Sequence, residues 1–453
     1  MTKHPILRTF VPAFSSLVLT SSLALTVMGC EEQPPAMMMT SPATLKTDAL
    51  VRYAEVYVSG TYSDWSISER PWIPVDLGST VGGELWIVQR MERSGSFDDT
   101  TECPSDSMSG AANDCNALQG STVAIAEPRT SSPAVDGSSA RFVVDGNAWH
   151  FMRRPSAIAF GDPNLTLDPT DFQGAANPDR TPVIASPVTY PDTFATCHEH
   201  STGNYTDQSA FIGPTLWTAD PAIYNGASPS ASDPSWKNGS HLDMVHATEY
   251  CMGIAYDSAN MYWTFNGALG TVDHYDFARP HVPGHYFHDD ATVTRYDFGD
   301  DALARLPNVP SNMIVVGEHL YIADTGNGRV VRFDRNDGEA NGAFRTYEGL
   351  FADIMTDITL ETVLDVDTLS GLWGGGRIEP SGLALLDADT LVVGNYGSGH
   401  ITLVGLDGTV HRTLDTGLGE GLAGISVIDG TIYFAHMVHR RVYRIDVDTT
   451  MRE

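Results

Sequence analysis

A phrase recurs along this chain, and its clearest copy runs from Pro310 to Asp334. It contains two short apolar runs, which begin at Pro310 and Leu320, followed by a glycine-rich turn and a third run that begins at Val330. Weaker copies lie on both sides of it. A β-propeller blade is a small antiparallel sheet that returns at such intervals along a sequence. The repeat therefore predicts an all-β propeller.

Six copies of the phrase can be counted. Their first apolar runs begin at Pro71, Pro155, Cys251, Pro310, Pro380 and Leu422. Their second runs begin at Leu85, Phe194, Tyr262, Leu320, Leu391 and Ile432. The last copy ends after its third run, and the alternating segment 50–58 can supply the missing strand and cover two exposed edges. We therefore predict a six-bladed propeller of four-stranded antiparallel blades over residues 49–453, closed by an N-terminal strand.

The N-terminus has the pattern of an export signal. Lys3 and Arg8 precede an apolar stretch over residues 10–27, and Gly29-Cys30 follows it. Such a segment is removed from the mature chain and takes no part in the fold. The small residue before Cys30 resembles the bacterial lipobox, and the resemblance implies cleavage at that point and diacylglycerol on the Cys30 sulfur. The alternative is an ordinary secreted protein with an incidental cysteine.

These features predict the organisation and the location of the chain. We expect residues 1–29 to be a lipoprotein signal peptide. Residues 30–48 have no apolar period and are expected to form a flexible tether from the lipidated cysteine. The acylated Cys30 makes a lipid bilayer the expected partner. The expected location is the bacterial cell envelope, with the lipid anchor in the outer membrane, facing the periplasm or the cell surface.

The charge of the chain limits its partners. A net charge of −31 and a pI near 4.6 argue against nucleic acid, because phosphate contacts need a basic face. The acidity is typical of a solvated surface, and we expect a monomer. Calcium-binding loops are the alternative reason for the acidity. The segment from Asp334 to Glu339 resembles the start of such a loop but lacks its spaced terminal glutamate.

Four cysteines remain after the lipidation site. They are Cys103, Cys115, Cys197 and Cys251. An even number in an exported protein predicts disulfides, and four cysteines allow three pairings. Cys103 and Cys115 flank a polar loop, and a bond between them leaves Cys197 to pair with Cys251. Metal ligation by the thiolates of that second pair is the alternative.

The best copies of the phrase resemble NHL repeats. They are Pro310-Ser-Asn-Met-Ile-Val with the run from Leu320 to Asp334, and a second copy from Pro380 to Leu403. NHL propellers include lyases, lactonase-like enzymes and binding modules, so the resemblance implies a fold and no single function. In the NHL enzyme peptidylamidoglycolate lyase, some zinc histidines directly follow the inner-strand proline. The matching residues here include no histidine, which argues against that activity: Trp72, Ser156, Met252, Ser311, Ser381 and Ala423.

The mouth of the central channel is the first candidate site. In a propeller, the inner strands start and the second strands end on the same face near this channel. The residues expected there are Arg70, Gln89, Arg154, Cys197, His198, Glu249, Phe265, Asp324, Glu379, Asn395 and His436. This set is polar enough for a ligand site, and Arg154, Glu249 and Asp324 are its catalytic candidates. The alternative is that these residues only bond neighbouring blades and channel water.

Two sets of histidines are candidate metal ligands. His198 and His200 alternate along a strand and so face one side, where His436 or Glu249 could join them. The second set is His281, His285 and His288, on a Pro-Gly turn expected on the face opposite the channel mouth. Zinc or copper suits either set, and calcium suits only the acidic loops. The alternative for the second set is a polar insertion bonded to its own backbone.

Two functions fit this pattern. The first is a lipid-anchored binding module at the cell envelope that takes a protein, a glycan or a small molecule and performs no catalysis. The second is a metal-dependent lyase or lactonase-type enzyme with its site at the mouth of the channel. The absence of histidine at the lyase positions favours the binding module.

Overall fold

A computed structural model of the protein describes residues 47–48, 54–58, 72–91, 122–126, 135–136, 141–144, 155–168, 186–201, 212–224, 239–283, 285 and 288–447. The chain divides into two compact units, residues 1–44 and 45–453, and every described residue lies in the second. Helices are short in this described part: α2 (Pro221–Tyr224), α3 (Val366–Leu372) and the 3₁₀ turn η2 (Gly299–Asp301). None of the described helices is long and apolar enough to cross a membrane.

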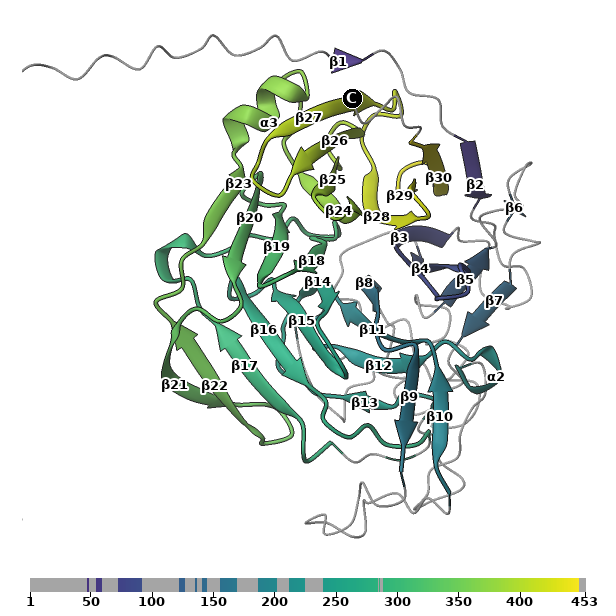
Figure 1. Cartoon of the computed structure of the whole chain (residues 1–453), viewed down its shortest axis with the longest axis vertical. Coiled ribbons are helices and arrows are strands. Elements are labelled where there is room, and N and C mark those ends of the chain that lie inside the picture. The colour runs from purple at the N-terminus through teal and green to yellow at the C-terminus, as the bar shows by residue number, and fades with distance from the viewer. Residues whose placement is uncertain are drawn as a thin grey trace, which may run out of the picture. The chain divides into compact units, whose positions relative to one another are not determined.

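The second unit is an all-β propeller, as the repeat predicts (Figure 1). Five of its sheets each take four antiparallel strands from one continuous stretch of chain, in place of the six blades predicted. The first two are β3 (Trp72–Ser79), β4 (Leu85–Met91), β5 (Thr122–Ala126) and β7 (Arg141–Val144), then β8 (Pro155–Phe160), β11 (Thr193–His198), β12 (Thr215–Thr218) and β13 (Asp243–Met244).

The other three blades follow in chain order. The third is β14 (Cys251–Tyr256), β15 (Met261–Asn266), β16 (Thr271–Asp276) and β17 (Thr292–Tyr296). The fourth is β18 (Met313–Val316), β19 (His319–Asp324), β20 (Arg329–Asp334) and β23 (Glu361–Leu364). The fifth is β24 (Pro380–Asp387), β25 (Thr390–Asn395), β26 (His400–Gly405) and β27 (Val410–Asp415), with β1 (Thr47–Asp48) parallel to β27 at its edge.

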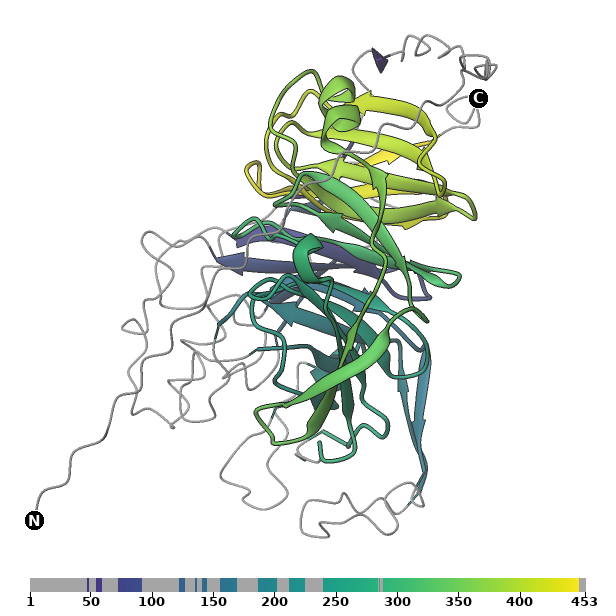
Figure 2. The ribbon, with the colours of Figure 1, turned by 90° about the vertical axis from the view of Figure 1, so that its left-hand side faces the viewer.

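The last repeat contributes only three strands to its sheet. They are β28 (Leu422–Ile428), β29 (Thr431–His436) and β30 (Arg441–Asp446). The strand predicted at the N-terminus joins them: β2 (Ala54–Val58) pairs antiparallel with β30 and parallel with β6 (Val135–Asp136). Two hairpins are additions to the repeat, β9 (Asn164–Leu167) with β10 (Val188–Pro191), and β21 (Glu339–Arg345) with β22 (Phe351–Thr356). The second hairpin, drawn in green, extends the sheet of β17 (Figures 1 and 2).

Local sequence explains both the strands and the turns. β29 consists largely of β-branched and aromatic residues, which favour extended backbone. Asp429 and Gly430 connect it to β28, both with positive φ (49° and 77°). An Asp-Gly pair with this backbone is the tight turn whose twist matches that of two antiparallel strands. Large aromatic side chains then fill the space between the sheets, among them Trp86, Trp217, Trp263 and Trp373.

The inner strands lie very close together. Their order of contact is β3, β8, β14, β18, β24 and β28, and β28 in turn contacts β3. Glycine is the third residue of three repeats, at Gly253, Gly382 and Gly424, and a Cβ at any of them would clash with the next inner strand. At Gly382 that Cβ would lie 2.5 Å from the carbonyl oxygen of Ala423. The repeat therefore keeps glycine where two backbones must meet.

We predict that Gly382→Ala lowers the free energy of unfolding by about 1–3 kcal/mol, because the added methyl group meets backbone that cannot move aside. The control is Gly371→Ala in α3, where a Cβ meets nothing within 4 Å. Alanine there should leave stability unchanged or raise it by up to about 1 kcal/mol. Denaturant unfolding of both variants checks this, and equal stability of the two would contradict the packing argument.

Candidate functional site

The inner strands enclose a cavity of about 380 Å³. All six of them line it, through residues 76–79, 158–160, 254–256, 312–315, 383–385 and 425–427. Most of the lining side chains are aliphatic or aromatic. Five lining residues have polar side chains: Asp76, Ser79, Tyr256, Asn312 and Ser426.

Asp76 and Asn312 meet across the centre of the ring. Asp76 belongs to β3 and Asn312 directly precedes β18, which is three strands away in either direction around the inner ring. The Asn312 amide donates to Asp76 Oδ2 at 3.1 Å, and the Ile158 backbone N–H donates to the same oxygen at 2.9 Å. The other oxygen, Oδ1, is buried and has no hydrogen-bond partner within the described residues. Burial raises the pKa of Asp76 to about 7, and its hydrogen bonds oppose that rise.

Several of the residues predicted at the channel mouth do end second strands, and two of them, Asp324 and Asn395, form hydrogen bonds with nearby loops. Asp324 accepts hydrogen bonds from the backbone of Ala304 at 2.8 Å and from the side chains of Asn327 at 2.8 Å and Arg329 at 2.7 Å. Asn395 bonds the loop before β24 in a similar way, with its Oδ1 2.8 Å from the Glu379 N–H. These contacts hold loops in place, which was the alternative interpretation of the mouth.

The other two catalytic candidates receive no support. Glu249 is exposed, and its backbone carbonyl accepts from Ala268. Arg154 and Arg70 lie outside the described residues. Among the described residues, none of the predicted carboxylates belongs to a group whose ligand atoms lie close enough to hold a metal.

Sequence reasoning missed the most buried ion pair at the mouth. Glu199 directly follows β11, and its carboxylate accepts from Arg90 at 3.1 Å, Arg305 at 2.9 Å and the Asn308 N–H at 2.9 Å. The Arg305 guanidinium stacks over the ring of Tyr250 at 3.8 Å. Three separate chain segments are joined by this one carboxylate. Its position at the end of a second strand was the available signal.

The first predicted histidine set does not gather. Among the described residues, the one group of histidine, cysteine or acidic side chains whose ligand atoms lie close enough for a metal contains neither His198, His200 nor His436. His198 is buried, and burial together with His200 and His246 lowers its pKa to about 3. His436 stacks on His439 at 4.1 Å and accepts from the His439 N–H. Burial lowers the pKa of His436 to about 4, and His439 adds to the effect.

One predicted pairing of cysteines is confirmed. Cys197 of β11 forms a disulfide with Cys251 of β14, with 5.2 Å between the Cα atoms. The bond joins two neighbouring blades and removes both sulfurs from consideration as thiolate ligands. Cys30, Cys103 and Cys115 lie outside the described residues.

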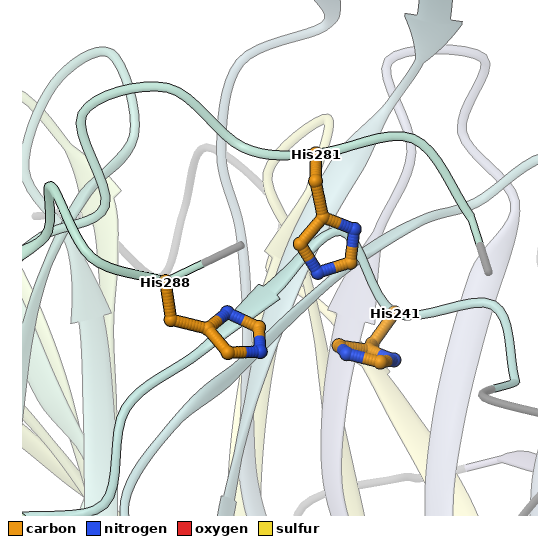
Figure 3. Close-up of side chains that lie close together, drawn as sticks. All are labelled: His241, His281 and His288. Atoms are coloured by element: carbon orange, nitrogen blue, oxygen red, sulfur yellow. The ribbon is translucent and has the colours of Figure 1, made fainter. Parts of the chain in front are cut away.

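The group that does gather consists of His241, His281 and His288. Each offers one ring nitrogen, and these three atoms lie within 4.8 Å of one another. Figure 3 shows the rings approaching from two chain segments, one before β13 and one between β16 and β17. All three side chains are buried, with exposed fractions of 2%, 0% and 5%. We call this group the histidine cluster.

Hydrogen bonds orient two of the rings. His288 donates from Nδ1 to Asp243 Oδ1 at 2.7 Å, and His281 donates from Nδ1 to the Val282 carbonyl at 2.8 Å. The donor is Nδ1 in the His281 bond, since an ordinary carbonyl only accepts, and we assign the same tautomer to His288, whose partner is a carboxyl group. Burial, then His241 and His288, hold the pKa of His281 well below its usual range, so its ring is neutral. Burial raises the pKa of Asp243 to about 7, against the opposing effect of His288.

The structure therefore brings together two residues of the second predicted set. His281 and His288 are in the histidine cluster, His285 is not, and His241 takes its place. His241 was missed because it lies 40 residues before His281 in the sequence. The available signal was the spacing of His241 and Asp243, which puts a histidine and a carboxylate two residues apart beside a short strand.

Comparisons with known proteins find only distant structural matches. No protein-family model matches the chain, and no curated protein sequence matches it. Among solved structures, a luciferin-regenerating enzyme matches at 10% identity and a TM-score of 0.40, over 88% of this chain and 96% of that one. A catalytically inactive virginiamycin B lyase from Staphylococcus aureus with quinupristin matches at 10% and 0.37, over 88% and 99%. An auxiliary nutrient binding protein from Bacteroides thetaiotaomicron matches at 9% and 0.40, over 87% and 76%. Values this low carry no conclusion about function.

We predict that Asp76→Asn changes stability in a pH-dependent way. Folding holds the carboxyl protonated up to a pKa of about 7, whereas the unfolded chain ionises near 3.8. The wild-type protein therefore loses stability as pH rises between these values, by roughly 1.4 kcal/mol for each pH unit of that interval, and the amide removes that loss. The variant should match the wild type near pH 4 and exceed it by a few kcal/mol at pH 8.

Urea unfolding at pH 4, 6 and 8 measures this difference. The control is Asp389→Asn, an exposed turn residue for which no pH-dependent difference is expected. A stability difference between wild type and Asp76→Asn that stays constant across the three pH values would contradict the assignment.

Proposed function

We propose that the protein is a binding module of the bacterial cell envelope that holds a small molecule in its central cavity. The cavity itself is the observation that carries the proposal. Its volume of about 380 Å³ lies in the range of small-molecule pockets, about 300–1,000 Å³. Such pockets are mostly apolar and fix their ligand through a few polar groups. The wall with Asp76 and Asn312 fits that description.

The chemistry of the wall indicates the class of ligand. Asp76 keeps one buried oxygen without a hydrogen-bond partner among the described residues. Asp76 is also the acidic residue of the cavity lining, so a ligand that donates a hydrogen bond or carries an amine is complementary to it, while an apolar body fills the rest of the cavity. We therefore expect a small amphiphilic molecule with one basic or donating group. A protein or a glycan on the outer surface is the other class of partner proposed for the binding module.

The alternative of a metal-dependent lyase or lactonase at the channel mouth has less support. Its expected ligands do not form a group among the described residues, and Asp324 is saturated with hydrogen bonds. The positions that match the lyase histidines include Ser156 and Ser381. These two hydroxyls donate to the backbone carbonyls of Cys251 and Leu422, the first residues of the next inner strands. They act as contacts between blades.

We also infer the finer organisation of the chain. The sheet of β28, β29, β30 and β2 serves as a sixth blade of an NHL-like ring, supported by the contacts of β28 with both β24 and β3 and by the pairing of β2 with β30. Export, acylation at Cys30 and a tether that begins there rest on the sequence pattern alone. The last two residues of the predicted tether, residues 47–48, form β1 and pair with β27. A soluble ligand captured near a membrane is consistent with that placement, and the acidic charge disfavours nucleic acid.

We predict that Ser426→Trp abolishes ligand binding, because Ser426 lines the cavity and the indole occupies its volume. The matched control is Ser258→Trp, which makes the same substitution in an exposed turn. A panel of small amphiphilic amines, screened by thermal shift, should raise the Tm of the wild type and the control but not of Ser426→Trp. A free ligand concentration of 100 times Kd should stabilise the folded protein by about 2.7 kcal/mol.

Binding of an amine should strengthen from pH 6 to pH 8, because Asp76 becomes ionised as pH passes its pKa of about 7. Amines that stabilise Ser426→Trp as much as the wild type would place the site elsewhere. A panel with no stabilising compound would contradict the proposed ligand class.

A further inference from the structure

We propose that His241, His281 and His288 bind a transition-metal ion of the zinc class. The ion would join the loop between β16 and β17 of one blade to the chain just before β13 of the neighbouring blade. This site is independent of the proposed function, because no residue of the histidine cluster lines the central cavity.

The hydrogen bonds leave the correct atoms available. The Nδ1 atoms of His281 and His288 donate to a backbone carbonyl and to the Asp243 carboxylate. A ring that donates from Nδ1 has its lone pair on Nε2. Metal-bound histidines show this arrangement, with the second ring nitrogen donating to a carboxylate or carbonyl that fixes the ring. The protein has this supporting shell in place.

The unpaired nitrogens need a partner. The Nε2 atoms of both His281 and His288 are buried, and neither has a hydrogen-bond partner in the described part of the chain. An acceptor withdrawn from water without a replacement bond lowers stability. The three rings lie edge to face or tilted, with centroids 4.8–5.7 Å apart. A single cation among the rings satisfies the Nε2 atoms of His281 and His288 together and takes a third ligand from His241.

The ligand set selects the metal. Three imidazoles without a ligating carboxylate suit Zn²⁺ or Cu²⁺, whereas Ca²⁺ and Mg²⁺ prefer oxygen ligands. Ligands at about 2.0–2.1 Å in a tetrahedral site lie roughly 3.3 Å apart. The three nitrogens lie within 4.8 Å of one another, and small rotations of the rings would bring them to this spacing. Three protein ligands leave a fourth position for water or another ligand.

Both segments that carry the ligands are held in place. The His281 N–H donates to the Leu242 carbonyl at 2.8 Å, which ties the loop directly to the chain beside His241. The Arg279 side chain donates to Asp290 Oδ2 at 2.6 Å and closes the base of the loop. Little chain entropy is lost when the ion binds such a prepared site. The burial of the cluster and this location between two blades indicate a structural role.

The test uses the purified full-length chain, stripped with a chelator and dialysed, then titrated with Zn²⁺ and with Co²⁺ as a spectroscopic probe. One ion per chain should bind, raise the Tm, and give Co²⁺ visible bands typical of tetrahedral coordination. X-ray absorption of the zinc form should show nitrogen ligands of the imidazole type near 2.0 Å. Sulfur ligands near 2.3 Å would show that cysteines bind the ion and would overturn the assignment.

Variants identify the ligands. His241→Ala and His288→Ala should each weaken Zn²⁺ binding by about 100-fold or more, since each removes one of three ligands. The matched control is His285→Ala, in the same loop but outside the cluster, which should bind Zn²⁺ as the wild type does. Asp243→Asn keeps the shape of the side chain and should weaken binding roughly 10- to 100-fold by loosening His288.

Loss of binding in His285→Ala equal to that in His241→Ala would overturn this ligand set. So would the absence of a bound ion in the wild type, or Zn²⁺ affinity that survives in His241→Ala. Where an alanine variant fails to fold, the X-ray absorption of the wild type still decides between imidazole and sulfur ligands. The cavity variant Ser426→Trp should bind Zn²⁺ normally, so that failure of one proposal is distinguishable from failure of the other.

Discussion

The close approach of the inner strands is the constraint on which the rest of this propeller depends. Gly253, Gly382 and Gly424 allow the backbones to meet where any side chain would clash. Serine adds a bond at the same level, because Ser156 and Ser381 each donate to the first carbonyl of the next inner strand. The repeated proline, serine and glycine thus occupy the positions at which one inner strand contacts the next. These contacts stabilise the fold, and they involve the residues nearest the channel mouth.

This constraint decides where chemistry is available. Side chains at the mouth form hydrogen bonds that connect separate chain segments. Glu199 accepts from three partners in this way, and Asp324 accepts from its own partners. The central cavity is the space that the inner strands leave unfilled. Aliphatic and aromatic side chains make up most of its lining, and Asp76 is the acidic residue among them.

The sequence predicted those parts of the structure that repeat. Strands β18 to β20 follow the apolar runs of the copy at Pro310, and β2 lies within the predicted segment 50–58. Which histidines lie together was harder to predict, for a geometric reason. His198 and His436 both end second strands, but these strands belong to different blades of the propeller. Equivalent positions in two blades therefore do not bring the two imidazole rings together. His241 and His281 lie together because the loop between β16 and β17 of the third blade contacts the chain just before β13 of the second blade. No pattern within a single repeat predicts that contact.

The two unusual features of this chain lie at the same junction. The disulfide joins β11 to β14, and the histidine cluster joins the chain before β13 to the loop after β16, so both connect the second blade to the third. Each of these blades has a weaker copy of the repeat than the blade that begins at Pro310, and the chain between β8 and β13 includes the added hairpin β9–β10 and α2. A covalent bond near the inner strands and a set of converging imidazoles near the outer strands supply contacts from both ends of that junction.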